Sequence, residues 1–267
     1  MIITNKIYNE DCIITMTRIP DEFVDLTITS PPYDNLRTYK GITWNEDIWK
    51  IIINDLFRIT KQGGVVVWVV GDATINGSET GTSFKQALYF INCGFNLHDT
   101  MIYEKNGSSF PSRRDGNRYT QIFEYMFIFS KGKPTKASLI CDKKNRWIGC
   151  IPGKSEVKDK NGKVKKIKWK PVPSFSPRNN IWRYSTGANY STKDKIAFEH
   201  PAIFPDKLVH DHILSWSNED DLIYDPFMDS GTTAKMAKQL SRHFIGSELS
   251  KEYCGIAKQR LAQEYLF

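Results

Sequence analysis

The sequence predicts an α/β fold, a doubly wound and mostly parallel sheet with a basic target-recognition region inserted into it. Strand-like and helix-like segments alternate in both the first and the last part of the chain, which is typical of such sheets. The run Val65–Val70 is continuously apolar, as in a strand buried on both faces. The 267 residues are enough for one domain of this kind with a small addition.

The first part of the chain contains alternating elements with clear end signals. Pro31 and Pro32 end the first strand, and Gly63-Gly64 follows the first helix. The predicted elements are a strand at 23–28, a helix at 49–59, a strand at 65–70, a helix at 83–92 and a strand at 122–129.

The last part of the chain resumes the same alternation. Ser250 is placed to cap the final helix. The predicted elements are a helix at 205–216, a strand at 222–224, a helix at 232–240, a strand at 243–246 and a helix at 251–264.

Residues 131–185 interrupt the alternation and are rich in Lys, Pro, Gly and Ser. Within them, 131–170 hold 14 Lys and Arg against 3 Asp and Glu, whereas the whole chain has a net charge of +7. Such a basic segment indicates a polyanionic partner, and a solvated Lys-rich loop is the alternative. We therefore expect a catalytic domain formed by 1–130 and 186–267, with an insertion at 131–185.

Several classes of protein are disfavoured. The first residues lack the features of a signal peptide, and the longest apolar run has six residues, too few to cross a bilayer. We expect a cytoplasmic, nucleoid-associated protein without a membrane partner. The five cysteines form no Cys-x-x-Cys pair, and His210 and His212 lack further ligands nearby, so no metal is expected.

A small-residue turn at Asp225–Thr233 lies between a predicted strand and a predicted helix. Ligands bind at the carboxyl ends of strands in open α/β sheets, where a helix amino terminus helps to hold polar groups. Glu248 ends the next strand, 23 residues after Asp225, close to the spacing of a carboxylate that binds ribose hydroxyls. An ordinary strand–turn–helix is the alternative. The candidate cofactor residues here are Asp225, Phe227, Ser230, Gly231, Thr232 and Glu248.

A second signal is Thr29-Ser30-Pro31-Pro32-Tyr33, also at a strand end, where a plain Pro-Pro turn is the alternative. Together with the Asp225 turn, this segment resembles the DNA amino-methyltransferases, which methylate adenine N6 or cytosine N4. That family carries a D/N/S-P-P-Y tetrapeptide and a D-P-F-x-G-S-G-T turn. The resemblance covers most of 1–130 and 180–260. The motif order is that of the family's β group, in which the intervening segment recognises the target.

The resemblance implies S-adenosylmethionine as cofactor and double-stranded DNA as partner. It places Asp11 near the cofactor's adenine, Phe204 and Pro205 near its methionine end, and Thr29 beside it. It permits a homodimer and a cognate restriction endonuclease. Asp229 departs from the pattern, because the family's turn has Gly there, and its charge disfavours the cofactor's carboxylate.

The catalytic segment suits the chemistry of an exocyclic amino group, whose lone pair is delocalised into the ring. The Ser30 side chain and the Pro31 carbonyl can each accept one N–H and direct the lone pair at the sulfonium methyl. Pro31 and Pro32 stiffen the loop. Tyr33 would stack on the base after it leaves the duplex, which costs a few kcal/mol. The predicted catalytic residues are Ser30, Pro31, Pro32 and Tyr33.

Ser in the first position of the tetrapeptide favours cytosine N4, because adenine enzymes more often carry Asp. Methylation of cytosine C5 is excluded, because it needs a cysteine nucleophile and the sequence has no Pro-Cys pair. N6-adenine methylation, methylation of RNA or protein, and a catalytically inactive DNA-binding protein with Asp229 as its lesion stay as alternatives.

Basic and aromatic residues outside these motifs are candidates for DNA contact. A loop combines three arginines with an aromatic residue, although a solvated loop would look the same. The candidates are Arg113, Arg114, Arg118 and Tyr119 in that loop, and Lys165, Lys166 and Lys168 in the basic segment.

Overall fold

The computed structural model describes residues 2–34, 44–107, 118–151, 156–166, 169–187 and 189–263. The chain forms two compact units, one of Met1–Ser138 with Asn180–Phe267 and one of Leu139–Asn179. Candidates Arg113, Arg114 and Lys168 lie outside the described residues. In the described parts of the chain, no helix is long and apolar enough to cross a membrane.

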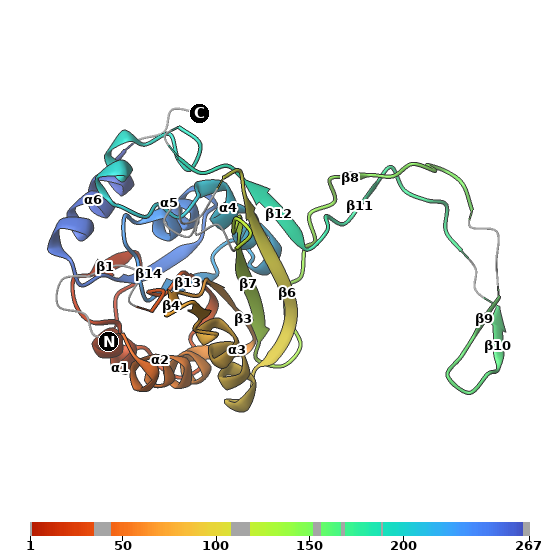
Figure 1. Cartoon of the computed structure of the whole chain (residues 1–267), viewed down its shortest axis with the longest axis horizontal. Helices are drawn as coiled ribbons and strands as arrows, with labels where there is room; N and C mark the ends of the chain where they lie inside the picture. Colours follow the sequence, from red (N-terminus) through yellow and green to blue (C-terminus); the bar gives the residue numbers. More distant parts are fainter. Residues whose placement is uncertain are drawn as a thin grey trace. The chain divides into compact units, whose positions relative to one another are not determined.

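The first unit is built on one eight-stranded sheet (Figure 1). All its neighbouring strands are parallel except at β7, which runs against both its neighbours. The strand order is β1 (Lys6–Tyr8), β14 (His243–Ser247), β13 (Leu222–Asp225), β2 (Val24–Thr29), β3 (Thr60–Val70), β7 (Phe123–Ser130), β6 (Asn96–Lys105) and β12 (Ile181–Tyr184).

In the part of the chain that the structure describes, six α-helices cover the sheet in two groups of three. Figure 1 shows α1–α3 together and α4–α6 together on opposite sides of the sheet. Their bounds are α1 (Cys12–Arg18), α2 (Glu46–Ile59), α3 (Thr82–Asn92), α4 (Asp206–Trp216), α5 (Thr232–Gln239) and α6 (Lys251–Ala262). A 3₁₀ helix, η2 (Lys195–Glu199), precedes α4, and β4 (Thr74–Ile75) pairs with β5 (Ser78–Glu79).

The apolar patterns explain why these segments take up their places. The Val65–Val70 run of β3 is fully buried between the helix layers. Below it, α2 buries Ile52 and Leu56, which stand one helical turn apart. Side chains of Asn45 and Ser250 cap α2 and α6 by accepting backbone N–H groups, the latter as predicted.

The predicted fold class is confirmed, and the helices and strands expected from the sequence are present with small shifts of their ends. Four elements of the eight-stranded sheet and its helix layers were not predicted, namely β1, α1, β6 and β12, and neither were η2 and the short strands β4, β5 and β8–β11. Strand β6 begins with five exposed residues, Asn96–Thr100, and therefore has no continuous apolar signal. Strand β12 lies inside the segment expected to be an insertion, yet it pairs with β6 at the edge of the sheet.

The second unit, Leu139–Asn179, is shorter than the expected insertion at 131–185. Residues at both ends of that segment belong to the first unit, because β12 joins its sheet and buried Lys131 donates to the carbonyls of Phe57 and Thr60. The second unit contains two short antiparallel pairs, β8 (Lys143–Lys144) with β11 (Phe175–Ser176) and β9 (Glu156–Lys158) with β10 (Val164–Lys166). Among its described side chains none is buried.

Candidate active site

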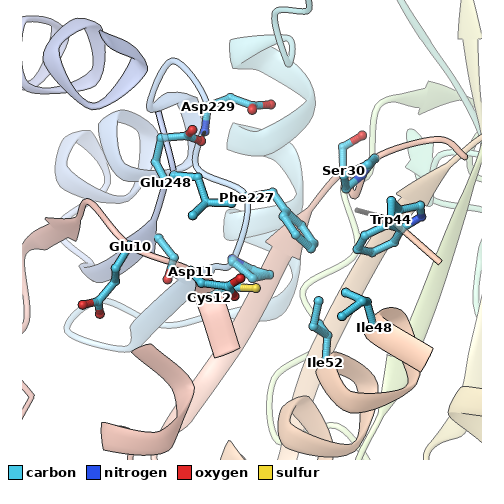
Figure 2. A pocket seen from close by; sticks show the side chains of 14 residues that line it. Glu10, Asp11, Cys12, Ser30, Trp44, Ile48, Ile52, Phe227, Asp229 and Glu248 are labelled. Atoms are coloured by element: carbon cyan, nitrogen blue, oxygen red, sulfur yellow. Dashed lines mark hydrogen bonds between the residues drawn. The ribbon is translucent and has the colours of Figure 1, made fainter. Parts of the chain in front are cut away.

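A cavity of about 300 Å³ opens at the edge of the sheet where the parallel strands end. The segments that follow β1, β2, β13 and β14 all reach it, as expected for strands that run the same way. Figure 2 shows Glu248 and Asp229 on one side of the cavity, Ser30 and Trp44 on the other, and Phe227 between them. The lining residues are Glu10, Asp11, Cys12, Ser30, Pro32, Trp44, Ile48, Ile52, Pro226, Phe227, Asp229, Ser247, Glu248 and Leu249.

Asp225 holds the turn after β13 from behind the cavity and does not line it. Its buried carboxyl accepts hydrogen bonds from the hydroxyls of Thr29 at 2.7 Å and Thr233 at 2.6 Å, and from the backbone N–H of Phe227 at 3.0 Å. Burial raises the pKa of Asp225 to about 7. Asp225 and Thr29 therefore join the end of β2 to the turn after β13.

Ser230 and Thr232 are fixed by Arg260 of α6, whose side chain is fully buried. The Arg260 guanidinium donates to the Ser230 carbonyl at 2.8 Å, to the Ser230 hydroxyl at 3.1 Å and to the Thr232 hydroxyl at 3.0 Å. It also pairs with Asp194 and Asp206, which share Lys235 as a second cation. Ser230 and Thr232 thus support the turn and do not line the cavity.

Gly231 allows α6 to pack directly against this turn. Its φ is +82°, in the left-handed region, and an added Cβ would lie 2.6 Å from the Cβ of Ala257. Any side chain at this position would be strained and would push α6 away from the turn. The glycine is therefore required by packing as well as by backbone conformation.

Glu248 presents its carboxylate to the cavity at the end of β14. One oxygen accepts the backbone N–H of Asp229 at 2.9 Å, and the other accepts that of Ser250 at 2.7 Å. Burial, followed by the negative charge of Asp229, raises the pKa of Glu248 to about 7. These two N–H groups fix the orientation of the carboxylate, and its remaining lone pairs can accept hydroxyl groups of a ligand.

Asp229 occupies a left-handed position with φ 47°, as the sequence allowed for Asp. Its Oδ1 atom lies 3.4 Å from Nε2 of His200, whose side chain is fully buried. Burial lowers the pKa of His200, but the Asp229 carboxylate outweighs this effect, and the net result is a raised pKa. The sequence shows the charge of Asp229 alone, whereas the structure places beside it a buried imidazole whose pKa it raises.

The other predicted cofactor residues are divided between the cavity and its surroundings. Asp11 lines the cavity and also caps α1 by accepting the N–H of Ile13. Phe227 lines it as well. Pro205 is buried at the start of α4, and Phe204 is partly buried beside it; neither lines the cavity.

An apolar wall of the cavity was missed by the sequence reasoning. Ile48 and Ile52 come from α2 and Trp44 from the segment just before it, and the Trp44 ring meets Phe227 edge to face at 5.5 Å. The helical spacing of Ile48 and Ile52 was visible in the sequence, but a pattern of apolar residues does not distinguish a cavity wall from core. Cys12 also lines the cavity; burial raises the pKa of its thiol, so it is not an activated nucleophile.

The catalytic segment follows β2 on the far side of the cavity from Glu248. Ser30 and Pro32 line the cavity, and Pro31 is buried. The Tyr33 hydroxyl lies 2.9 Å from the Ser30 hydroxyl and donates to Glu124 Oε2 at 3.0 Å. Glu124 stands at the start of β7, and Lys105, at the end of β6, forms an ion pair with it. Neither Glu124 nor Lys105 was singled out by the sequence, because they belong to no motif.

The described DNA-binding candidates are divided between the two units. Tyr119 is fully exposed, and the exposed Arg118 donates to the carbonyl of Gly77 in the turn between β4 and β5. Lys165 and Lys166 lie in β10 of the second unit. Their role in DNA binding stays a prediction.

The fold and the site together define a class of protein, the Rossmann-like methyltransferases that use S-adenosylmethionine. The chain belongs to the N6/N4 DNA methylase family, whose sequence model matches residues 24–259. It is 58% identical to the orphan methyltransferase M.BamHII of Bacillus amyloliquefaciens over 91% of this chain and 90% of that protein. It is 27% identical to the type II methyltransferase M.BglII of Bacillus subtilis, over 97% of this chain and 69% of that protein.

Solved structures agree on the fold. The PvuII DNA methyltransferase, described as cytosine-N4-specific, superposes with a TM-score of 0.73 at 20% identity, covering 98% of this chain and 88% of that one. The complex of M1.HpyAVI with S-adenosylmethionine gives a TM-score of 0.62 at 22% identity, covering 97% and 99%. The predicted family, fold class and cofactor are confirmed, and the chain is a DNA methyltransferase.

The cavity fits the cofactor on its own chemistry. An apolar wall of Trp44, Ile48 and Ile52 suits a purine ring, and a buried, oriented carboxylate at Glu248 suits ribose hydroxyls. When bound, S-adenosylmethionine supplies the electrophilic methyl group. Glu248, Asp11 and Phe227 would hold it, while the turn fixed by Asp225 and Arg260 keeps them in place.

Proposed function

We propose that this enzyme methylates the exocyclic N4 of cytosine at specific sites in double-stranded DNA, with the target base turned out of the duplex. The observation that carries the proposal is the position of Ser30, which lines the same cavity as Glu248 on the opposite side (Figure 2). A cofactor held by Glu248 and an amino group held by Ser30 would therefore meet within one cavity.

Ser30 and Pro31 then perform the chemistry as hydrogen-bond acceptors. The amino nitrogen donates one N–H to the Ser30 hydroxyl oxygen and one to the Pro31 carbonyl, which takes its lone pair out of conjugation with the ring. With the cofactor bound, its methyl group would form the N–C bond as the C–S bond breaks, and the electron pair of the C–S bond would stay on sulfur. The proton of the methylated nitrogen would then pass to solvent water. No covalent enzyme intermediate is required, in keeping with the buried thiol of Cys12.

The choice of cytosine over adenine rests on Ser30 as the first residue of the tetrapeptide. The PvuII enzyme, which shares the fold, is described as cytosine-N4-specific and supports the same choice. N6-adenine methylation is the alternative, because the family includes both reactions. The pairing of Asp229 with His200 supports an active enzyme over an inactive DNA-binding protein, because it offsets the charge that had suggested a lesion.

We further propose that the second unit recognises the target. By sequence, its 41 residues carry 12 Lys and Arg against 3 Asp and Glu. Exposed aromatic rings at Trp147 and Trp169 stand among them. Positive charge binds phosphate, and exposed aromatic and polar side chains can reach base edges.

The basic segment can be tested with a variant that replaces Lys165, Lys166 and Lys168 by Gln. We expect the slope of log affinity for DNA against log salt to fall by about 0.9 for each lost phosphate contact. A triple replacement at exposed Lys195, Lys251 and Lys258 of the first unit is the control. Equal slopes for both variants would show that the three lysines of the second unit do not contact DNA.

The cellular setting is inferred from the names of the relatives. Several relatives are named type II methyltransferases, and the Bacillus amyloliquefaciens relative is named an orphan methyltransferase. We infer a site-specific modification enzyme of the restriction–modification type that acts in the cytoplasm on nucleoid DNA. A homodimer and a cognate endonuclease stay predictions.

The reaction is tested by identifying its product. The purified protein is incubated with S-adenosylmethionine and unmethylated DNA, and the digested nucleosides are analysed by mass spectrometry. N4-methylcytidine in its deoxy form supports the proposal. N6-methyladenine would keep the mechanism and overturn the choice of base, and no methylated base on any DNA would overturn the proposed function.

A further inference from the structure

We propose that Glu124 is a positioning residue for the methyl transfer, acting through the Tyr33 hydroxyl to direct the Ser30 hydroxyl at the target amino group. The inference rests on the proposed role of Ser30 as an acceptor. It adds a function for Tyr33 besides stacking, and it assigns a role to two residues outside the motifs, Glu124 and Lys105.

The topology of the sheet brings these groups together. Strand β7 is antiparallel to its neighbours, so its first residues lie at the edge where β2, β3 and β6 end. Glu124, the second residue of β7, therefore lies beside the catalytic segment, opposite Tyr103 in the pairing with β6. Lys105 ends β6 two residues further on and reaches the same carboxylate.

The contacts form a continuous chain of four side chains. Lys105 pairs with Glu124 Oε1, Glu124 Oε2 accepts from the Tyr33 hydroxyl at 3.0 Å, and that hydroxyl lies 2.9 Å from the Ser30 hydroxyl. Only 7% of Glu124 is exposed, and its side chain and that of Lys105 are shielded from water. A hydrogen bond to a charged partner in such surroundings is stronger than one on the surface.

The direction of these hydrogen bonds follows from counting the available protons. An ionised carboxylate only accepts hydrogen bonds, so the single Tyr33 hydroxyl proton is directed to Glu124. The Tyr33 oxygen must then accept the hydroxyl proton of Ser30. With its own proton engaged, the Ser30 oxygen presents lone pairs to the cavity and can accept the N–H of the target.

Two further features hold this arrangement. Lys105 forms an ion pair with Glu124 through Oε1, which leaves the other carboxylate oxygen, Oε2, to accept from Tyr33. The Tyr33 ring lies against Gly71 at the end of β3, where an added Cβ would be 3.4 Å from the ring. A carbonyl oxygen, that of Val69, is also 3.4 Å from the Tyr33 hydroxyl, a longer and weaker second acceptor.

Tyr33→Phe tests the chain most cleanly, because the ring and the Glu124–Lys105 pair both stay. We expect the single-turnover rate of methyl transfer, measured with saturating cofactor and DNA, to fall about 10-fold, the value of one hydrogen bond near a charge. The dissociation constant of S-adenosylmethionine and the KM for DNA should stay within twofold. Tyr125→Phe is the matched control, because Tyr125 follows Glu124 on the opposite face of β7, packed against Phe84.

Coupling distinguishes positioning from a merely structural role. Glu124→Gln should lower the rate to a similar extent, and the Tyr33→Phe, Glu124→Gln double variant should be no slower than the slower single variant. In a Ser30→Ala background, Tyr33→Phe should not lower the rate of methyl transfer any further. An unchanged rate in Tyr33→Phe, or effects of Tyr33→Phe and Ser30→Ala that multiply, would overturn the inference.

The proposed role of Ser30 is tested separately. It would be wrong if the Ser30→Ala variant transferred methyl groups at the wild-type rate. Thermal unfolding of each variant shows whether it folds. If Glu124→Gln does not fold, Tyr33→Phe alone and in the Ser30→Ala background still decides the inference, because neither change leaves a buried charge without its partner.

Discussion

The two sides of the cavity hold a carboxylate in opposite ways. On the cofactor side, Glu248 has backbone N–H groups as partners and Asp229 as a negative neighbour, and its pKa is raised to about 7. On the catalytic side, Glu124 is held by an ion pair with Lys105 and by the Tyr33 hydroxyl. The raised pKa of Glu248 leads us to expect cofactor binding to depend on pH near neutrality.

The difference matches the two tasks. A carboxylate that binds a ligand needs lone pairs free toward the cavity, and Glu248 lines the cavity. A carboxylate that orients another group needs to be ionised and immobile, and Glu124 acts at a distance through Tyr33. Each side can thus be disturbed without the other, which gives the predictions that follow.

The largest effect is expected for Ser30→Ala on the catalytic side. This change removes the acceptor of one target N–H, and the loss of one such catalytic hydrogen bond lowers a rate by about 10²- to 10³-fold. Single-turnover transfer to DNA measures it. Ser215→Ala, which removes a buried hydroxyl of α4 that does not line the cavity, is the control. A Ser30→Ala rate within threefold of wild type would contradict the role given to Ser30.

The next effect is expected for Glu248→Ala on the cofactor side. Loss of two hydrogen bonds from ribose hydroxyls to a carboxylate, each of about 1.5 kcal/mol or more, should weaken S-adenosylmethionine binding roughly 100-fold. Calorimetric titration measures the dissociation constant. Glu252→Ala, exposed in the first turn of α6, is the control. Unchanged binding by Glu248→Ala would show that the cofactor is held elsewhere.

The effect of pH on cofactor binding should be smaller than that of Glu248→Ala, and it should arise from the titration of Glu248. Because the pKa of Glu248 is about 7, the carboxyl is protonated in most molecules at pH 6 and must lose its proton to accept two hydroxyls. Affinity should rise by at most about tenfold per pH unit up to pH 7 and level off above it. The Glu248→Gln variant should lose this dependence, and an affinity that increases on acidification would contradict the assignment.

The smallest effect is expected for Asp229→Asn, which tolerates the left-handed backbone while removing the charge. The charge of Asp229 raises the pKa of Glu248, so the pH midpoint of cofactor binding should move to lower pH in this variant. His200 loses its carboxylate partner at the same time, which limits the change in affinity at pH 8 to about two- to fivefold. An unchanged pH midpoint of cofactor binding would show that the charge of Asp229 does not affect the pKa of Glu248.

The sequence predicted the parts of this site that carry a local pattern. The Asp225 turn, Glu248 and the Ser30 tetrapeptide each follow a strand in the sequence, and parallel strands bring their ends to one edge. The sequence could not divide them into cavity-lining and supporting residues. Asp225, Thr29, Ser230 and Thr232 were expected at the cofactor but hold the turn from behind, through contacts with residues as distant as Arg260.

The residues that the sequence did not reveal depend on pairing between distant strands. Glu124 reaches Tyr33 only because β7 runs antiparallel, and its register with β6 also sets the place of Lys105. His200 reaches Asp229 from a segment 29 residues earlier in the chain. Neither contact has a fixed spacing in the sequence. For the same reason β12, which pairs with β6, was taken as part of the insertion.

The central claim is that binding of the cofactor and activation of the target are carried by separate sides of one cavity. The most direct test is the equilibrium affinity of S-adenosylmethionine for the Ser30→Ala protein. The account predicts a dissociation constant within twofold of wild type in a protein that transfers almost no methyl groups. An affinity weakened tenfold or more would show that Ser30 belongs to the cofactor site and would contradict the separation.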